Sequence, residues 1–217
     1  MEINKFYGQL PTPVTEIQVD CKEMMFYQYL PIKLAQQHPK SLLQFENRLE
    51  VFTPLIEKCC IDFIDKFGLN EYWDSYVYLT AKHMFQLRDT SFNRLGYHSD
   101  GFLTNDINYV WSNNHPTIFN SGKFNLTLDD KVSIMEMEEQ AKVENEMYFP
   151  NNTILRLDQY NIHRVMPISY DCMRTFVKVS FSKDKYDLEG NAHNYLLDYN
   201  WEMKKRKIER NIPQSNL

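Results

Sequence analysis

The clearest pattern in this chain is an alternation of polar and apolar side chains at residues 174–181, Arg-Thr-Phe-Val-Lys-Val-Ser-Phe. The run is rich in β-branched and aromatic residues, which favour strands. Successive side chains of a strand point to opposite faces, so Arg174, Phe176 and Lys178 share one face. The pattern predicts a strand that begins at Arg174, where a long side chain can point into the mouth of a barrel.

Further strand-like runs precede this one and predict a mainly-β fold. They combine aromatic and β-branched residues and are bounded by turn-forming residues. These runs are residues 21–30, 76–87, 105–113, 117–120 and 153–158.

One helical region precedes most of these strands. Apolar residues between 42 and 64 recur at helical spacing, with Ser41 as a plausible N-cap and Gly68 as a plausible stop. Pro54 restarts or kinks the helix. We expect one or two helices over 41–67 that cover the outside of a sheet.

Three other segments are less clearly patterned. Residues 1–20 indicate an extended arm, and the acidic, Met-rich run 131–146 fits either a helix or a long insertion between strands. Residues 200–211 fit a short basic helix or a solvated tail.

The length of 217 residues predicts one domain with a sizeable core. We divide it into an N-terminal arm with helices (1–72), a β core (73–183) and a C-terminal extension (184–217). A net charge of −5 disfavours strong nonspecific binding to nucleic acid, although a local basic patch is not excluded.

The four cysteines form no Cys-x-x-Cys motif, and Cys59 and Cys60 are adjacent. This usage favours reduced, buried thiols and a cytoplasmic location over a zinc ribbon or a redox site. The polar N-terminus predicts no signal peptide. The sequence contains no run of 18 apolar residues, so it predicts no transmembrane helix.

The candidate chemistry lies in His98-Ser-Asp100 and in His163. Two imidazoles and one carboxylate can occupy one face of an Fe(II) centre and leave the other positions open. The short motif alone is weak, because His98 can equally be a loop histidine beside a turn. The strand-like context of His163 and Arg174 strengthens the interpretation.

These residues resemble the Fe(II)/2-oxoglutarate-dependent dioxygenases, with the prolyl-hydroxylase-like branch as the nearest match. The resemblance covers roughly residues 75–182. The motifs that carry it are His98-Ser-Asp100, Ile107-Asn-Tyr-Val-Trp111, Pro116-Thr-Ile-Phe119, His163-Arg-Val-Met-Pro167 and Arg174. It implies a double-stranded β-helix (jelly roll) with supporting N-terminal helices.

The resemblance also implies the ligands of the site. His98, Asp100 and His163 would bind Fe(II), and Arg174 would pair with the far carboxylate of the co-substrate 2-oxoglutarate. Many relatives carry a serine two residues after this arginine, whereas this chain has Phe176. We therefore take Tyr109 as the candidate hydroxyl partner of the co-substrate.

The activity implied is hydroxylation of an unactivated C–H bond with O2, releasing succinate and CO2. A carboxylate at Asp100 fits a hydroxylase, since related halogenases carry a small residue there. The unidentified primary substrate is a protein side chain or a small metabolite such as an amino acid, with a nucleobase third because of the acidic charge. Two alternatives stay open: a non-enzymatic jelly-roll binding or structural protein with a vestigial metal site, and a zinc hydrolase.

Overall fold

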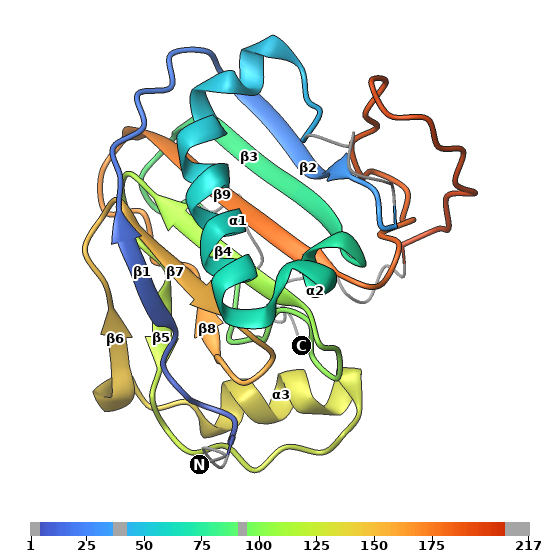
Figure 1. The fold of residues 1–217 in the computed structure, drawn as a ribbon. Coiled ribbons are helices and arrows are strands. Elements are labelled where there is room, and N and C mark those ends of the chain that lie inside the picture. The colour runs from blue at the N-terminus through green and yellow to red at the C-terminus, as the bar shows by residue number, and fades with distance from the viewer. Residues whose placement is uncertain (1–4, 37–42, 91–94, 207–217) are drawn as a thin grey trace.

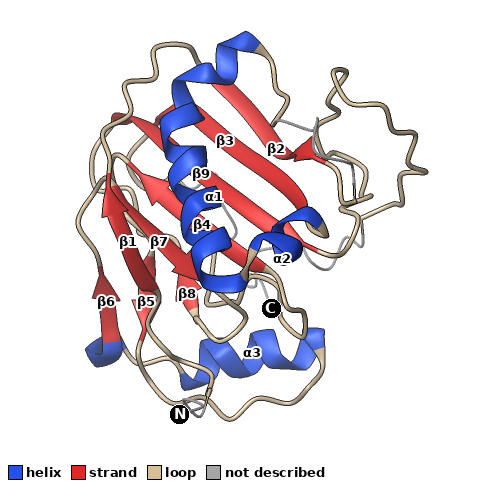
Figure 2. Ribbon diagram, in the orientation of Figure 1, coloured by secondary structure: helices blue, strands red, loops and turns tan. Residues whose placement is uncertain are grey.

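The computed structural model describes residues 5–36, 43–90 and 95–206, which form two antiparallel β-sheets with a few helices (Figure 2). The large sheet has the order β1-β7-β4-β9-β3-β2, and the small sheet has the order β6-β5-β8. The strands are β1 (Thr12–Glu16), β2 (Met25–Lys33), β3 (Tyr76–Gln86), β4 (Ile107–Ser112), β5 (Ile118–Asn120), β6 (Glu146–Tyr148), β7 (Thr153–Leu157), β8 (His163–Arg164) and β9 (Cys172–Ser182).

The path of the chain between the two sheets is that of a double-stranded β-helix. From β3 in the large sheet it passes to His98, which joins the small sheet through an antiparallel bridge to His163 in β8. It returns to the large sheet at β4, crosses to β5 and β6, returns at β7, crosses to β8 and ends in β9. The predicted mainly-β jelly roll is confirmed by this winding.

The helices are the 3₁₀ helices η1 (Asn47–Phe52) and η2 (Val143–Asn145) and the α-helices α1 (Thr53–Phe67), α2 (Leu69–Trp73) and α3 (Asp130–Gln140). Helix α1 lies across one face of the large sheet, as Figure 1 shows. Pro54 sits in its first turn, and the helix ends at Gly68. Gly68 has a φ of 95°, a conformation that suits glycine.

The predicted helix over 41–67 is confirmed only in part. Residues 43–46 are not helical, residues 47–52 form the 3₁₀ helix, and Ser41 lies outside the described residues. Pro54 explains the break, because proline suits the first turn of a helix and disrupts its interior. The run 131–146 does contain a helix, α3.

The main core lies between α1 and the large sheet. Phe63 of α1 stacks on Phe181 of β9, with ring centroids 4.1 Å apart and planes 11° apart. The side chains that α1 buries recur at one helical face and meet the apolar face of β9. They are Leu55, Ile56, Cys59, Cys60 and Phe63.

Both ends of the chain add to this frame. The N-terminal arm contributes β1, which pairs with β7 at the edge of the large sheet, a position that tolerates Pro13. The C-terminal extension returns along β2, where the Ala192 amide donates to the Gln28 carbonyl at 2.8 Å. Residues 200–206 form no helix, and the rest of the predicted basic helix lies outside the described residues. None of the helices within the described ranges has the length and apolar character to cross a bilayer.

Candidate metal centre and its cavity

The structure brings the two predicted histidine ligands side by side. The amide of each donates to the carbonyl of the other at 2.9 Å, which closes the bridge between the segment of His98 and β8. The imidazole centroids are 4.5 Å apart. Asp100 follows His98 by two residues, so its carboxylate returns to the same side at the turn made by Gly101.

Both imidazoles are oriented by backbone carbonyls. Nδ1 of His98 lies 3.0 Å from the Gly96 carbonyl oxygen, and Nδ1 of His163 lies 2.9 Å from that of Asn161. Because a carbonyl can only accept, Nδ1 carries the proton in each ring. In the neutral form of each ring Nε2 is therefore the unprotonated nitrogen, the arrangement that outer partners give to metal-binding histidines.

The donor set fits a divalent metal. One potential ligand atom from each of His98, Asp100 and His163 lies within 4.8 Å of the others. Nε2 of His163 is 3.7 Å from Oδ2 of Asp100, and two metal–ligand bonds of about 2.1 Å can span up to about 4.2 Å. Burial lowers the pKa of His163, which favours the neutral imidazole that a metal requires.

Lys178 of β9 also reaches this centre. Its Nζ is 3.1 Å from Oδ2 of Asp100 and donates to the hydroxyl of Tyr29 at 3.1 Å. Burial alone would raise the pKa of Asp100, but Lys178 and the two imidazoles together hold that pKa below its ordinary value. Burial would lower the pKa of Lys178, but Asp100 and Tyr29 raise it. Asp100 is thus an anion and Lys178 a cation at neutral pH.

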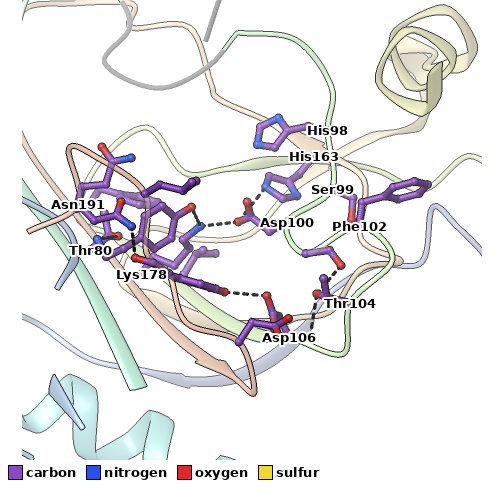
Figure 3. Close-up of a pocket in the computed structure, with 18 of the residues that line it drawn as sticks. Thr80, His98, Ser99, Asp100, Phe102, Thr104, Asp106, His163, Lys178 and Asn191 are labelled. Carbon is purple, nitrogen blue, oxygen red and sulfur yellow. Dashed lines mark hydrogen bonds and ion pairs between the residues drawn. The ribbon is translucent and has the colours of Figure 1, made fainter. Parts of the chain in front are cut away.

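A cavity of about 600 Å³ opens in front of these residues (Figure 3). Its floor is the face of the large sheet opposite α1, which carries Thr80, Lys82 and Lys178. Burial, with Lys178 and Arg174 nearby, lowers the pKa of Lys82 to about 8. Lys82 and Lys178 thus share this face, and Lys178 is the one that pairs with Asp100.

Tyr109 is not part of the cavity, so its assignment to the co-substrate is corrected. It is buried in the core on the α1 side of β4, and its hydroxyl donates to Oδ2 of Asp62 at 2.8 Å. Its neighbour Val110 lines the cavity, as strand alternation requires. Tyr109 thus lies on the opposite face of β4 from the predicted metal ligands.

Arg174 is buried on β9, but it does not line the cavity either. Its Nε and Nη2 donate at 2.9 Å to the carbonyls of Asn114 and His115. Burial lowers the pKa of Arg174 to about 10. This guanidinium therefore ties β9 to the turn between β4 and β5, and Lys178 is the cation that the strand presents to the centre.

Tyr29 is a cavity residue that the sequence did not single out. The pairing of β2 with β3 shifts register between Tyr27 and Leu30, and Tyr29 has a φ of 49°. Its amide donates to Oγ1 of Thr80 at 3.0 Å, which holds this conformation. A bulge of this kind redirects a side chain. The only sequence signal for its role is the tyrosine in a predicted strand.

The C-terminal extension forms one wall of the cavity. Tyr186 stacks on Tyr78 with centroids 4.1 Å apart, and its hydroxyl donates to Oδ2 of Asp106 at 2.8 Å. Asn191 donates to the Tyr186 carbonyl at 2.6 Å. The polar composition of this segment concealed its contribution to the site.

Comparison with known proteins adds little to the assignment of this chain to a family. No family model and no curated protein matches the chain. Among solved structures, a 2OG-Fe(II) oxygenase family oxidoreductase from Burkholderia pseudomallei is similar over 81% of this chain and 74% of its own, with 14% identity and a TM-score of 0.42. EvdO2 from Micromonospora carbonacea var. aurantiaca is similar over 61% of this chain, with 12% identity and a TM-score of 0.42. The chain spans 62% of EvdO2. Because both scores are low, the fold rests on the strand order of this chain.

Proposed function

We propose that this protein is an Fe(II)- and 2-oxoglutarate-dependent oxygenase that hydroxylates a C–H bond of a protein side chain or small metabolite. In this reaction one atom of O2 enters succinate, the other enters the substrate as a hydroxyl group, and CO2 is released. The observation that carries the proposal is the meeting of His98, Asp100 and His163 at one end of a cavity whose floor carries the buried Lys178.

The three side chains would hold Fe(II) through Nε2 of each imidazole and a carboxylate oxygen of Asp100. A 2-His-1-carboxylate set with open positions is typical of non-haem iron oxygenases. When bound, the iron supplies the activation of O2 that is coupled to decarboxylation of 2-oxoglutarate. The preset tautomer of both histidines supports this role, because neither ring must reorient before it binds.

Lys178 is the residue we assign to the far carboxylate of 2-oxoglutarate, in place of Arg174. It is buried, it faces the cavity, and it now pairs with Asp100. A metal ion on Asp100 would satisfy that carboxylate and leave the Lys178 ammonium for another anion. The burial of Lys178 on β9 supports this exchange of anionic partners, since a buried cation without an anionic partner is costly.

Tyr29 and Lys82 complete this anion site in our proposal. The hydroxyl of Tyr29 already accepts from Lys178, and it can donate its own proton to a carboxylate oxygen. Lys82 adds a second positive charge on the same sheet face. Tyr29 therefore takes the role that we had expected of Tyr109.

The cavity also has room for a primary substrate. Pockets of about 300–1,000 Å³ accommodate ligands of drug size, and 2-oxoglutarate fills only part of such a volume. The wall that Tyr186, Asp106 and Asn191 build faces this remaining space. These groups would orient the substrate by stacking and hydrogen bonds.

The direct test is succinate formation from 2-oxoglutarate by purified protein loaded anaerobically with Fe(II) and then exposed to air. We expect slow succinate release even without the primary substrate, none under argon, and none with Zn(II) in place of Fe(II). Metal binding without succinate formation, in the presence of a wide panel of peptides and metabolites, would support the vestigial site. Hydrolysis of a member of this panel by the Zn(II) form would support the zinc hydrolase.

A further inference from the structure

The segment between β5 and β7, residues 121–152, contains two glutamates that contact the chain beside the metal ligands. Oε2 of Glu138 in α3 accepts from the amide of Tyr97 at 2.7 Å. Glu146 in β6 accepts from the hydroxyl of Tyr97 and from Arg164. Tyr97 directly precedes His98, and Arg164 directly follows His163. Both glutamates thus act on residues adjacent to the two histidines.

Tyr97 and Arg164 face each other across the bridge that joins the histidines. His98 pairs with His163 in antiparallel fashion, so the residue before the first lies opposite the residue after the second. Strand alternation directs their side chains away from the imidazoles. Any sliding of one segment past the other would therefore separate Tyr97 from Arg164 as well as the two imidazoles.

Glu146 links these two side chains. Its Oε1 accepts from Nε of Arg164 at 2.9 Å and from Nη2 at 2.7 Å, and it also accepts from the Tyr97 hydroxyl. Nε of Arg164 lies 3.2 Å from that hydroxyl. The side chains of Glu146 and Arg164 are 17% and 24% exposed, so solvent screens this ion pair only in part.

Glu146 and Arg164 form an ion pair, and Tyr97 is its neutral hydrogen-bond partner. Partial burial would raise the pKa of Glu146, but Tyr97 and Arg164 lower it. Burial and the bond to Glu146 raise the pKa of Tyr97, so the phenol stays protonated and donates.

Gly96 allows the second glutamate to approach. A Cβ at this position would lie 3.1 Å from Oε2 of Glu138, and the residue has a φ of +85°. The carbonyl of the same glycine accepts from Nδ1 of His98. The backbone that orients the first imidazole is therefore held in place by α3.

We infer that Glu146, Tyr97 and Arg164 form a positioning clamp that sets the register of the two metal-binding histidines. Glu146 is a positioning residue that acts through Tyr97 and Arg164 and touches neither metal nor substrate. The inference rests on the proposed metal site. It gives the 121–152 segment a function, because this segment supplies the Glu146 carboxylate on the side of the His98–His163 bridge that faces away from the imidazoles. We expect that loss of one contact of this clamp alters the arrangement of the two histidine ligands without unfolding the sheet.

The test compares Glu146→Gln with Glu144→Gln, an exposed glutamate of η2 that serves as the matched control. Each metal-free protein is titrated with Co(II), whose visible absorption reports both affinity and ligand geometry. We expect Glu146→Gln to weaken Co(II) binding roughly tenfold or more and to change the spectrum, because partners behind metal ligands typically contribute 10–100-fold in affinity. Glu144→Gln should match the wild type.

Thermal unfolding of the same metal-free proteins separates positioning from stability. A variant that loses thermal stability but keeps wild-type Co(II) affinity and spectrum would overturn the clamp. If Glu146→Gln does not fold, Tyr97→Phe keeps the ring and removes the two hydrogen bonds of its hydroxyl, to Glu146 and from Arg164, while the Glu146–Arg164 ion pair stays, so it should show a smaller shift in the same direction. Unchanged Co(II) binding in Tyr97→Phe would then overturn it. A wild type that binds no Co(II) would overturn the metal site itself and the clamp with it.

Discussion

The two faces of the large sheet are built from the same strands and carry opposite chemistry. On the α1 side, β9 presents Val177, Val179 and Phe181 to the buried apolar core. On the cavity side, the same strand presents Lys178 to a carboxylate and a phenol. Neighbouring residues of β9 therefore have different roles, because those on one face pack in the core and those on the other face line the cavity. Substitutions on the first face should alter stability, and those on the second should alter binding.

Two buried lysines show how strongly the surroundings decide a charge. Lys33 is fully buried, and among the described residues it donates to three neutral carbonyls, those of Leu34, Trp73 and Ser75, at 2.8–3.1 Å. Burial lowers its pKa to about 8. The pKa of Lys178 is raised instead, because Asp100 outweighs the same burial effect. A directly paired anion therefore offsets the effect of burial on Lys178, whereas the carbonyls around Lys33 do not offset it fully.

The largest effect on stability should come from the core face. Phe63→Ala removes the ring that stacks on Phe181 and should lower the free energy of unfolding by about 3–5 kcal/mol. Ile61→Ala, on the exposed side of the same helix, should cost less than about 0.5 kcal/mol. Urea denaturation of metal-free protein measures both. Co(II) affinity of folded Phe63→Ala should equal that of the wild type, and a large loss would break the division between the faces.

On the cavity face, Lys178→Met should weaken 2-oxoglutarate binding with little loss of metal affinity. Removing a hydrogen bond to a charged group costs about 1.5–3 kcal/mol, which corresponds to roughly ten- to hundredfold in affinity. Calorimetry with the Co(II) form measures this change. Arg174→Met is the comparison, because Arg174 bonds to backbone carbonyls. A greater loss of affinity in Arg174→Met than in Lys178→Met would restore the arginine to the co-substrate site.

The fold was largely predictable because the decisive signals are local. Alternation over 174–181 gave β9 and the faces of its side chains, and Gly68 gave the end of α1. The combination of His98 with His163 was proposed from residue types and strand context and strengthened by the resemblance, whereas their direct pairing, which joins segments 65 residues apart in sequence, is seen only in the fold. Residue types and spacing therefore identified the triad as a hypothesis that the geometry supports.

The errors arise where a local pattern is ambiguous or the contact is distant. In β4 both Val110 and Trp111 are buried, so apolar character could not show which face Tyr109 occupies. Tyr29 reaches the cavity through a bulge that no short motif announces. Glu146 lies in an acidic run, and only the folded sheet places it between Tyr97 and Arg164.

The lysine comparison can be sharpened by pH. The folded pKa of Lys33 lies below its unfolded value of 10.5, so between about pH 8 and 10.5 the unfolded state binds more protons and stability rises with pH. Across this window the free energy of unfolding of the wild type should therefore rise, relative to that of Lys33→Met, by about 1–3 kcal/mol. Urea denaturation at pH 7.5, 9 and 10.5 measures the gain. A constant difference would show that Lys33 titrates alike in both states.

Among the buried positions, the smallest effect should come from Tyr109→Phe. This change removes the hydrogen bond to Asp62, which Arg156 also contacts, and should cost about 1 kcal/mol of stability. Because the hydroxyl is on the core face, 2-oxoglutarate affinity should stay unchanged, whereas Tyr29→Phe should lower it severalfold. Calorimetry on both variants compares the two phenols. The opposite ranking would mean that the faces have been assigned the wrong way round.

The most direct test of the central claim is a paired measurement on His163→Ala and the wild type: bound Fe(II) per chain and succinate formed from 2-oxoglutarate in air. The account predicts that the variant keeps its fold by circular dichroism but loses bound Fe(II) and succinate formation together, because one of three protein ligands is gone. Wild-type succinate formation in a folded His163→Ala protein would contradict the account.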